Sequence, residues 1–182
     1  MLCYSIYLTK DNCIKSPREV HRLIDVDHKD PILRTFILFV QTADAVVKYA
    51  NAHFYKEVGL SAIKFIVLRI LATNGGTMTP SKLAQWTLRE RHNITTLVDR
   101  LEQDGLVSTK RDDRDKRFVN ITLTNKGQEV LTQATPVAKK IVDQVMLSIT
   151  EGDIVLLEKS LGVLRQNAHH GLERIPKRSQ HR

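Results

Sequence analysis

The chain has little that would place it in a membrane or among disulfide-stabilised proteins. No apolar run in its 182 residues approaches the roughly 18 consecutive residues that a bilayer-spanning helix needs. Residues 1–7 are too few and too poorly flanked for a signal peptide. Cysteine occurs only as Cys3 and Cys13, which suggests no disulfide framework. We therefore expect a cytoplasmic protein that has no membrane partner.

Sequence motifs for catalysis and metal binding are also absent. The chain has no Gly-rich phosphate loop, no Gly-x-Ser-x-Gly elbow and no His-Glu-x-x-His helix. Its histidines do not follow a zinc-binding spacing, and no paired Cys motif accompanies them. We find no internal repeat and no low-complexity segment. We therefore expect no enzyme activity, no metal and no cofactor.

Positive charge is what the composition has in excess. The chain carries 28 Lys and Arg against 20 Asp and Glu, and its apolar share of 42% is enough for a core. A basic protein favours a polyanionic partner through counterion release, but composition alone does not separate DNA from RNA or a membrane surface. Residues 89–117 are nearly balanced, with eight basic and seven acidic side chains. Part of the excess lies in residues 171–182, a basic tail that we expect to be disordered.

Two short helices separated by a turn are predicted near the middle of the chain. Thr79 and Pro80 suit the N-cap and first position of a helix, since threonine accepts an amide hydrogen bond and proline has no amide to satisfy. A turn over residues 87–89 leads into a second helix, which Gly105 ends. The apolar stripe of this second helix recurs at helical spacing and consists of Ile94, Leu97, Val98 and Leu101.

The face opposite this stripe is typical of a DNA-reading helix. Such a helix enters the major groove by its N-terminal half, where Arg bonds guanine and Thr bonds a base edge or a thymine methyl. Asp99 and Glu102 would be repelled by phosphates if the far end entered as deeply. The predicted contacts are Arg91, His92, Asn93, Thr95 and Thr96. An ordinary solvated helix face remains the alternative for any one of them.

A short hairpin with a charged tip follows the second helix. Residues 106–109 and 118–123 are β-branched and partly alternating, which predicts two strands. The tip contains too much acid for simple phosphate binding, so we infer that at least one aspartate orients an arginine. The side chains predicted to contact phosphates are Lys110, Arg111, Arg114 and Lys116. Ser81 and Lys82 are further candidates, because the first helix has free amides there, although plain solvent exposure is the alternative.

Long apolar patterns precede the two short helices. A helix of apolar period begins at Pro31, and Ser61 caps a further apolar helix that stops at residues 74–76. We expect the aromatic residues Trp86 and Phe118 to be packing residues, because one indole on a helix with a buried face is usually core.

A second long apolar face follows the hairpin. It runs from Val130 to Ile149, and Pro136 should bend its helix. Thr150 can cap one more apolar helix. These faces are too long for a small core to cover, so the first and last helices are predicted to form a homodimer interface. Two-fold symmetry then implies a nearly palindromic operator on double-stranded DNA.

These residues resemble the multiple antibiotic resistance regulator (MarR) family of winged helix-turn-helix proteins. The family's successive motifs are found here as Thr79-Pro80, Leu83-Ala84, Leu97-Val98-Asp99-Arg100-Leu101-Glu102, Gly105-Leu106-Val107, Asp115-Lys116-Arg117 and Leu123-Thr124-Asn125-Lys126-Gly127. Two positions depart from the pattern. Glu90 stands where the family usually has a serine N-cap, and Leu88-Arg89 replaces a small residue and a hydrophobe.

The resemblance implies a mainly α fold with a small β-hairpin wing (α+β), in which N- and C-terminal helices form a dimerisation region around a winged helix-turn-helix. It implies a homodimeric transcriptional regulator, a repressor released by a small-molecule effector. Arg117 would enter the minor groove, whose narrow stretches attract arginine, and Asp115 would position it.

The expected organisation has five regions, which follow one another in chain order. They are an N-terminal extension (1–29), a dimerisation helix (30–56), the DNA-binding domain (60–124), C-terminal dimerisation helices (125–170) and the basic tail (171–182). In the family, ligands lodge between the dimer helices and the DNA-binding lobe. The candidate lining in this chain is Phe36, Val40, Tyr49, Phe54, Phe65 and Leu68. Core packing is the alternative for most of these residues.

Two other functions stay open from the sequence. Some relatives of this family sense oxidants through a cysteine near the first helix, so Cys13 makes a thiol-based redox regulator one alternative. The other is a winged helix that serves as a protein-interaction or RNA-binding module. Steep salt dependence and a preference for one particular duplex would favour the DNA reader over that module.

Overall fold

The computed structural model describes residues 29–88, 91–111 and 119–175, and the chain divides into two compact units, Met1–Ala138 and Lys139–Arg182. The described residues form helices and one small antiparallel sheet, so the expected α+β class is confirmed. Within these ranges, no helix has the length and apolar character to span a membrane. Predictions for Cys13, Glu90 and the hairpin tip concern residues outside the described ranges.

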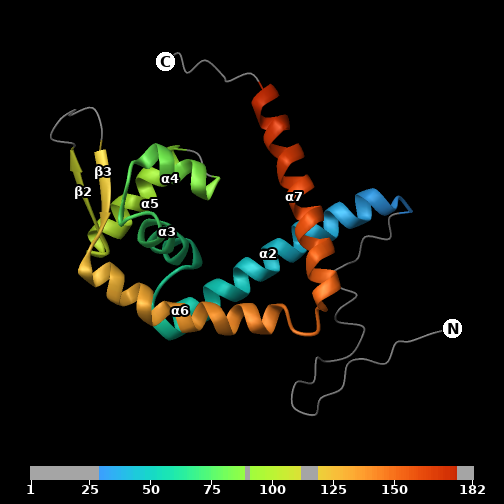
Figure 1. Ribbon diagram of the computed structural model, residues 1–182, viewed down its shortest axis with the longest axis horizontal. Helices are drawn as coiled ribbons and strands as arrows, with labels where there is room; N and C mark the ends of the chain where they lie inside the picture. The colour runs from blue at the N-terminus through green and yellow to red at the C-terminus, as the bar shows by residue number, and fades with distance from the viewer. Residues whose placement is uncertain (1–28, 89–90, 112–118, 176–182) are drawn as a thin grey trace, which may run out of the picture. The chain divides into compact units, whose positions relative to one another are not determined.

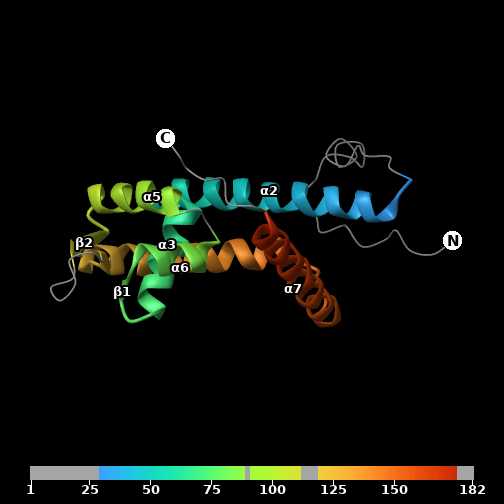
Figure 2. The ribbon, with the colours of Figure 1, turned by 90° about the horizontal axis from the view of Figure 1, so that it is seen from above.

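The first described helix, α2 (Pro31–Val58), is long and largely exposed. Asp30 caps it, because its carboxylate accepts a hydrogen bond from the Ile32 amide at 2.8 Å. The helix runs unbroken (Figure 2) until Gly59, whose φ of 64° is easy only for glycine. Phe54 is its one buried residue. This helix therefore contributes little to the core of its own unit.

Three further helices of the first unit contribute buried side chains to its core; Figure 1 labels them. They are α3 (Ala62–Thr73), α4 (Pro80–Thr87) and α5 (Arg91–Gln103). Ser61 and Thr79 cap α3 and α4 as predicted. The largest fully buried side chains are Leu68, Leu71, Leu83, Ile94, Leu101, Ile121, Val67 and Val107. Helices and sheet thus share one apolar core.

The sheet has three antiparallel strands in the order β1-β3-β2. The predicted hairpin is confirmed as β2 (Val107–Arg111) and β3 (Val119–Leu123), with Thr109 opposite Ile121. The strand β1 (Thr77–Met78) pairs with the other side of β3 and was not predicted. Two residues carry no readable alternation, so only the pairing with β3 makes β1 a strand. The strand β2 is left at an edge of the sheet.

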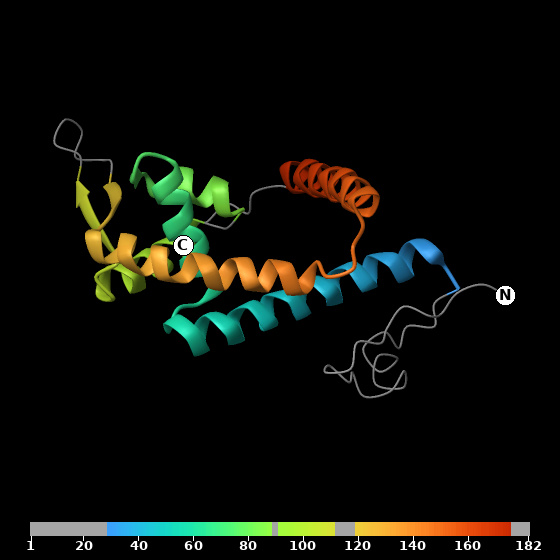
Figure 3. The ribbon, with the colours of Figure 1, turned by 60° about the horizontal axis from the view of Figure 1, so that its bottom comes forward.

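Two helices complete the described part of the chain. The strand β3 leads directly into α6 (Asn125–Val145), which continues through Pro136 and crosses the boundary between the units (Figure 3). In the second unit, Thr150 caps α7 (Glu151–Arg174) as predicted, and a reciprocal bond with Asp153 completes a capping box. No residue of α7 is buried.

One packing prediction is wrong. Trp86 is 59% exposed, although it was expected in the core. The helix α4 has only eight residues, and Leu83 is its one buried residue. A helix this short presents few positions to the core, and Trp86 does not occupy one of them. The companion prediction for Phe118 lies outside the described residues.

Candidate nucleic-acid interface

The helix α5 is buried on one side and polar on the other. Ile94, Val98 and Leu101 lie in the core. The side chains of His92, Asn93, Thr95 and Thr96 are exposed, as predicted for the DNA-reading face. Arg91 begins the helix, and the prediction for its side chain falls outside what the structure describes. The exposed face therefore offers hydrogen-bonding groups along the first two turns of α5.

The Thr96 hydroxyl has a bond that DNA could replace. It donates to the backbone carbonyl of His92 at 3.3 Å, one turn earlier in α5. Such a bond within the helix is weak and local, so the hydroxyl can rotate towards a base edge while the methyl group stays exposed. Thr96 can thus donate to a base or touch a thymine methyl.

The start of α4 offers a second group of donors. Ser81 and Lys82 are exposed. The Thr79 hydroxyl accepts the Lys82 amide at 3.4 Å, so this amide is already used by the cap. The Ser81 amide has no partner among the described residues and, with the Lys82 ammonium, can receive a phosphate.

The first wing strand presents two cations. Lys110 and Arg111 are exposed on β2, opposite Asn120 and Val119 of β3. They come directly before the hairpin tip. Predictions for Arg114, Asp115, Lys116 and Arg117 concern residues outside the described ranges.

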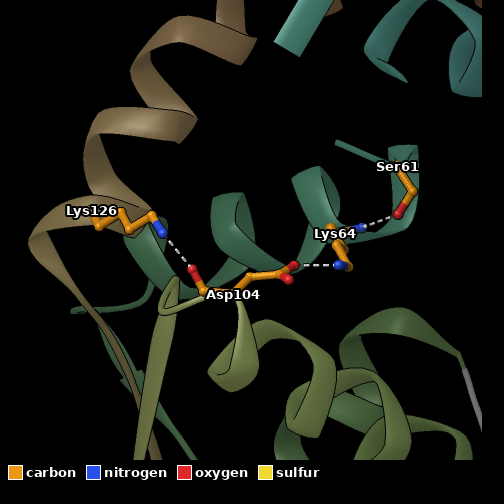
Figure 4. A network of polar contacts seen from close by, with 4 residues as sticks. All are labelled: Ser61, Lys64, Asp104 and Lys126. Carbon is orange, nitrogen blue, oxygen red and sulfur yellow. Dashed lines mark hydrogen bonds and ion pairs between the residues drawn. The ribbon is translucent and has the colours of Figure 1, made fainter. Parts of the chain in front are cut away.

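A junction at Asp104 anchors the end of α5 (Figure 4). The Asp104 carboxylate forms an ion pair with the Lys64 ammonium of α3. The Asp104 carbonyl accepts a hydrogen bond from the Lys126 ammonium of α6 at 2.7 Å. A cation beside the carbonyls at a helix C-terminus also interacts favourably with the helix dipole. The helix α5, which carries the predicted DNA-reading face, is therefore held by α3 and α6.

The exit from the wing is packed just as closely. The Thr124 hydroxyl donates to the Gly105 carbonyl at 2.7 Å and accepts the Gly127 amide at 3.0 Å. A Cβ atom on Gly127 would lie 2.1 Å from the Leu106 carbonyl oxygen, so only glycine fits there. This contact explains why a Leu-Thr-x-x-Gly exit suits the fold.

The predicted ligand-lining residues fall into two groups. The rings of Phe54 and Phe65 stack at 4.8 Å between centroids, and both are buried, as is Leu68. Packing in the core of the first unit accounts for these three. Phe36 and Val40 are exposed on α2, and the half-buried Tyr49 contacts the ring of His53.

Sequence reasoning missed the anchoring residues because they are far apart in the chain. Lys64 and Asp104 are separated by 40 positions, and no local pattern connects them. Within the described ranges, no three His, Cys, Asp or Glu side chains are placed to hold a metal ion.

Comparison with known proteins identifies the family. The MarR family model matches residues 58–117. The HTH-type transcriptional regulator YkoM of Bacillus subtilis is 37% identical over 112 residues, which cover 58% of this chain and 70% of YkoM. The HTH-type transcriptional repressor YetL of the same bacterium is 32% identical over 130 residues, which cover 70% of this chain and 78% of YetL.

A solved structure is similar over a larger part of the chain. It is the organohalide-sensing transcriptional regulator RdhR-CbdbA1625 with 2,4-dichlorophenol bound, and it has 27% sequence identity and a TM-score of 0.72. The match covers 86% of this chain and 89% of that one. The chain therefore belongs to the MarR family of winged-helix, DNA-binding transcriptional regulators.

Proposed function

We propose that this regulator is a sequence-specific repressor that binds a nearly palindromic DNA operator as a homodimer and leaves it when a small molecule binds. The observation that carries the proposal is the two-sided character of α5, whose apolar face is buried while its polar face is exposed. A helix so mounted can enter the major groove without disturbing the core. The relative YetL is a transcriptional repressor, which supports repression rather than activation.

The contacts divide between base reading and phosphate binding. Arg91, His92, Asn93, Thr95 and Thr96 would read bases in the major groove. The phosphate contacts would come from Ser81, Lys82, Lys110, Arg111, Arg114 and Lys116, which add affinity without sequence choice. Arg117 would enter the minor groove with Asp115 as its orienting partner, a role that the family motif supports.

The dimer is supported by apolar side chains that the single chain leaves in solvent. In α7, Leu156, Leu157 and Val163 are all exposed. Exposed apolar surface of this extent on helices is typical of an association surface. We propose that residues 30–56 and 125–170 form the dimer interface, while residues 60–124 bind DNA. The two copies of α5 would then reach successive major grooves, roughly 34 to 36 Å apart.

Release by a small molecule is supported by the bound 2,4-dichlorophenol in the structure of RdhR-CbdbA1625. A ligand releases DNA only to the extent that it prefers the conformation that DNA does not. Phe36, Val40 and Tyr49 are accessible candidates for contacting such a ligand. Contact with Phe54, Phe65 or Leu68 would require the ligand to displace the core.

Fluorescence anisotropy at near-physiological salt tests the proposal. The probes are the duplex upstream of the protein's own gene, a shuffled duplex and a double-stranded RNA of the same length. We expect a preference of about 10³ or more for the operator over the shuffled duplex. Equal, weak binding to all three probes, even after operator selection from random duplexes, would contradict it.

Two variants separate the proposed contacts. Thr96→Ala should chiefly relax sequence choice, because it removes a base contact. Arg117→Ala should weaken binding to every duplex, and most where the operator flank is A/T-rich. Equal losses on operator and random DNA for both variants would contradict this division of roles.

A further inference from the structure

The last turn of α5 is bonded directly to the first strand of the wing. One carboxylate oxygen of Glu102 accepts the Thr109 backbone amide at 2.6 Å and the Thr109 hydroxyl at 2.7 Å. The other oxygen lies 2.9 Å from the same hydroxyl. A single carboxylate therefore binds two groups of one residue on β2. Sequence reasoning placed Glu102 in the family motif and noted that phosphates would repel its charge, but gave it no partner.

We propose that Glu102 is a positioning residue of the DNA interface: it fixes the wing against the recognition helix so that both reach the operator in one geometry. The proposal rests on the proposed function, because only a sequence-specific reader needs this geometry. Glu102 itself contacts no base and acts through Thr109.

The backbone shows why the wing strand needs an outside partner. The strand β2 lies at the edge of the sheet and pairs only with β3. Amides of an edge strand point alternately towards the sheet and away from it. The Thr109 amide bonds Glu102 rather than β3, so it belongs to the outward set. Glu102 takes the place that a further strand would otherwise fill.

The turn between α5 and β2 does not depend on this carboxylate. The Gly105 amide already bonds the Glu102 carbonyl at 2.8 Å, and the Leu106 amide bonds the Leu101 carbonyl at 2.9 Å. These backbone bonds close the end of the helix. Glu102 is exposed, so its removal should cost the fold little. What it adds is a limit on how the helix and the strand rotate against each other.

That limit acts next to proposed DNA contacts. Lys110 and Arg111 follow Thr109 directly and are exposed on β2. A small rotation of β2 about its junction with α5 would move both cations. Two charge-assisted bonds to one carboxylate oppose such a rotation more than a single neutral bond does.

The direction in which DNA affinity changes when Glu102 is replaced tests the positioning role. A carboxylate near DNA repels phosphates, so losing it should strengthen binding to every duplex if charge is all that matters. The positioning role makes the opposite prediction for the operator. Asp99 is the matched control, since it is an exposed acid of the same helix with no partner among the described residues. Asp99→Ala and Glu102→Ala remove the same charge.

The experiment measures affinity for the wild-type operator, selected from random duplexes, and for a shuffled duplex. We expect Asp99→Ala to bind both as tightly as the wild type or more tightly. Glu102→Ala should bind the operator about tenfold more weakly, as expected for losing hydrogen bonds to a charged group, and the shuffled duplex no more weakly. Glu102→Gln keeps an oxygen for the Thr109 amide and should recover much of the loss.

A second variant makes the test independent of any single substitution. Thr109→Val removes the hydroxyl and should weaken operator binding, but it should add little in the Glu102→Ala background, because the two residues act as a pair. Thermal unfolding of each variant should stay close to that of the wild type. If Glu102→Ala unfolds, Glu102→Gln and Thr109→Val decide the result in its place.

The possible failures are distinguishable. If selection finds no duplex that the wild type prefers, the proposed function fails and this inference fails with it. If the wild type is selective and Glu102→Ala behaves like Asp99→Ala on both duplexes, the inference alone is overturned. Additive losses for Glu102→Ala and Thr109→Val would overturn it as well.

Discussion

Leu68 in α3 and Leu156 in α7 are the same residue type in opposite surroundings, 0% and 65% exposed respectively. The winged helix-turn-helix buries its apolar side chains in one core that its helices and sheet share. In the second unit, α7 has no buried residue at all. The first region buries its large apolar side chains within itself, whereas exposed apolar surface such as that of α7 is typical of a site of association. We therefore expect the first region to form the stable core and the second to serve in association.

Replacing the two leucines, Leu68 and Leu156, should change the free energy of unfolding by very different amounts. Leu68→Ala should lower the free energy of unfolding by about 2 to 5 kcal/mol, because it opens a cavity in the core. Leu156→Ala should change the stability of the isolated chain by less than about 0.5 kcal/mol. Urea unfolding at a protein concentration that favours monomers measures both. Equal losses would show that α7 is as much a core element as α3.

The next effect concerns assembly. Ile154, Leu157 and Leu164 form an exposed apolar stripe at helical spacing on α7. Leu157→Glu places a charge on this stripe, and burying that charge at an interface is costly. We expect the dimer dissociation constant to rise about a hundredfold, which corresponds to about 2.7 kcal/mol. Sedimentation equilibrium measures it, with Gln166→Glu as the control for added charge outside the stripe. An unchanged constant for Leu157→Glu would remove α7 from the interface.

A glycine-to-alanine substitution should change stability in opposite directions in the two regions. Gly127→Ala should destabilise the DNA-binding lobe by about 1 to 3 kcal/mol, because its Cβ would meet the Leu106 carbonyl. A Cβ on Gly162 of α7 meets nothing within 4 Å. Gly162→Ala should therefore stabilise α7 by about 0.5 to 1 kcal/mol through helix propensity. Thermal unfolding followed by circular dichroism checks both signs, and two losses would contradict the account.

The smallest effect lies at the start of α7. The side chain and then the backbone of Thr150 donate to Asp153 and hold the pKa of its carboxyl below the ordinary value of 3.8. A lowered folded-state pKa means that the stabilisation is complete above the unfolded value and is lost as the pH falls through the folded value. The helix content of α7 should therefore decline only below about pH 4. Asp153→Asn should make that decline disappear, as measured by circular dichroism.

The sequence was sufficient for features that depend on neighbouring residues. Ser61, Thr79 and Thr150 were identified as helix caps because a cap needs only its own side chain and an amide three residues later. The buried stripe of α5 followed from its period. The residues predicted to contact DNA on α5 are exposed, while their contacts with DNA stay predictions.

Features that depend on distant residues could not be predicted. The strand β1 exists only through its pairing with β3, and the Asp104 anchor joins α3, α5 and α6. The bond of Glu102 to Thr109 was not predicted, because Thr109 lies beyond a turn. Trp86 was assigned to the core by residue type, but α4 is too short to bury a second large side chain. In each case the missing information was three-dimensional contact.

Sedimentation velocity of the protein on its selected operator tests most directly whether the protein binds DNA as a dimer. We expect two chains on one duplex, because the proposed dimer of α2 and α7 brings two copies of α5 to the same operator. We also expect Leu157→Glu to lose this complex at concentrations where the wild type keeps it. A single chain bound to the operator with full specificity would contradict the account.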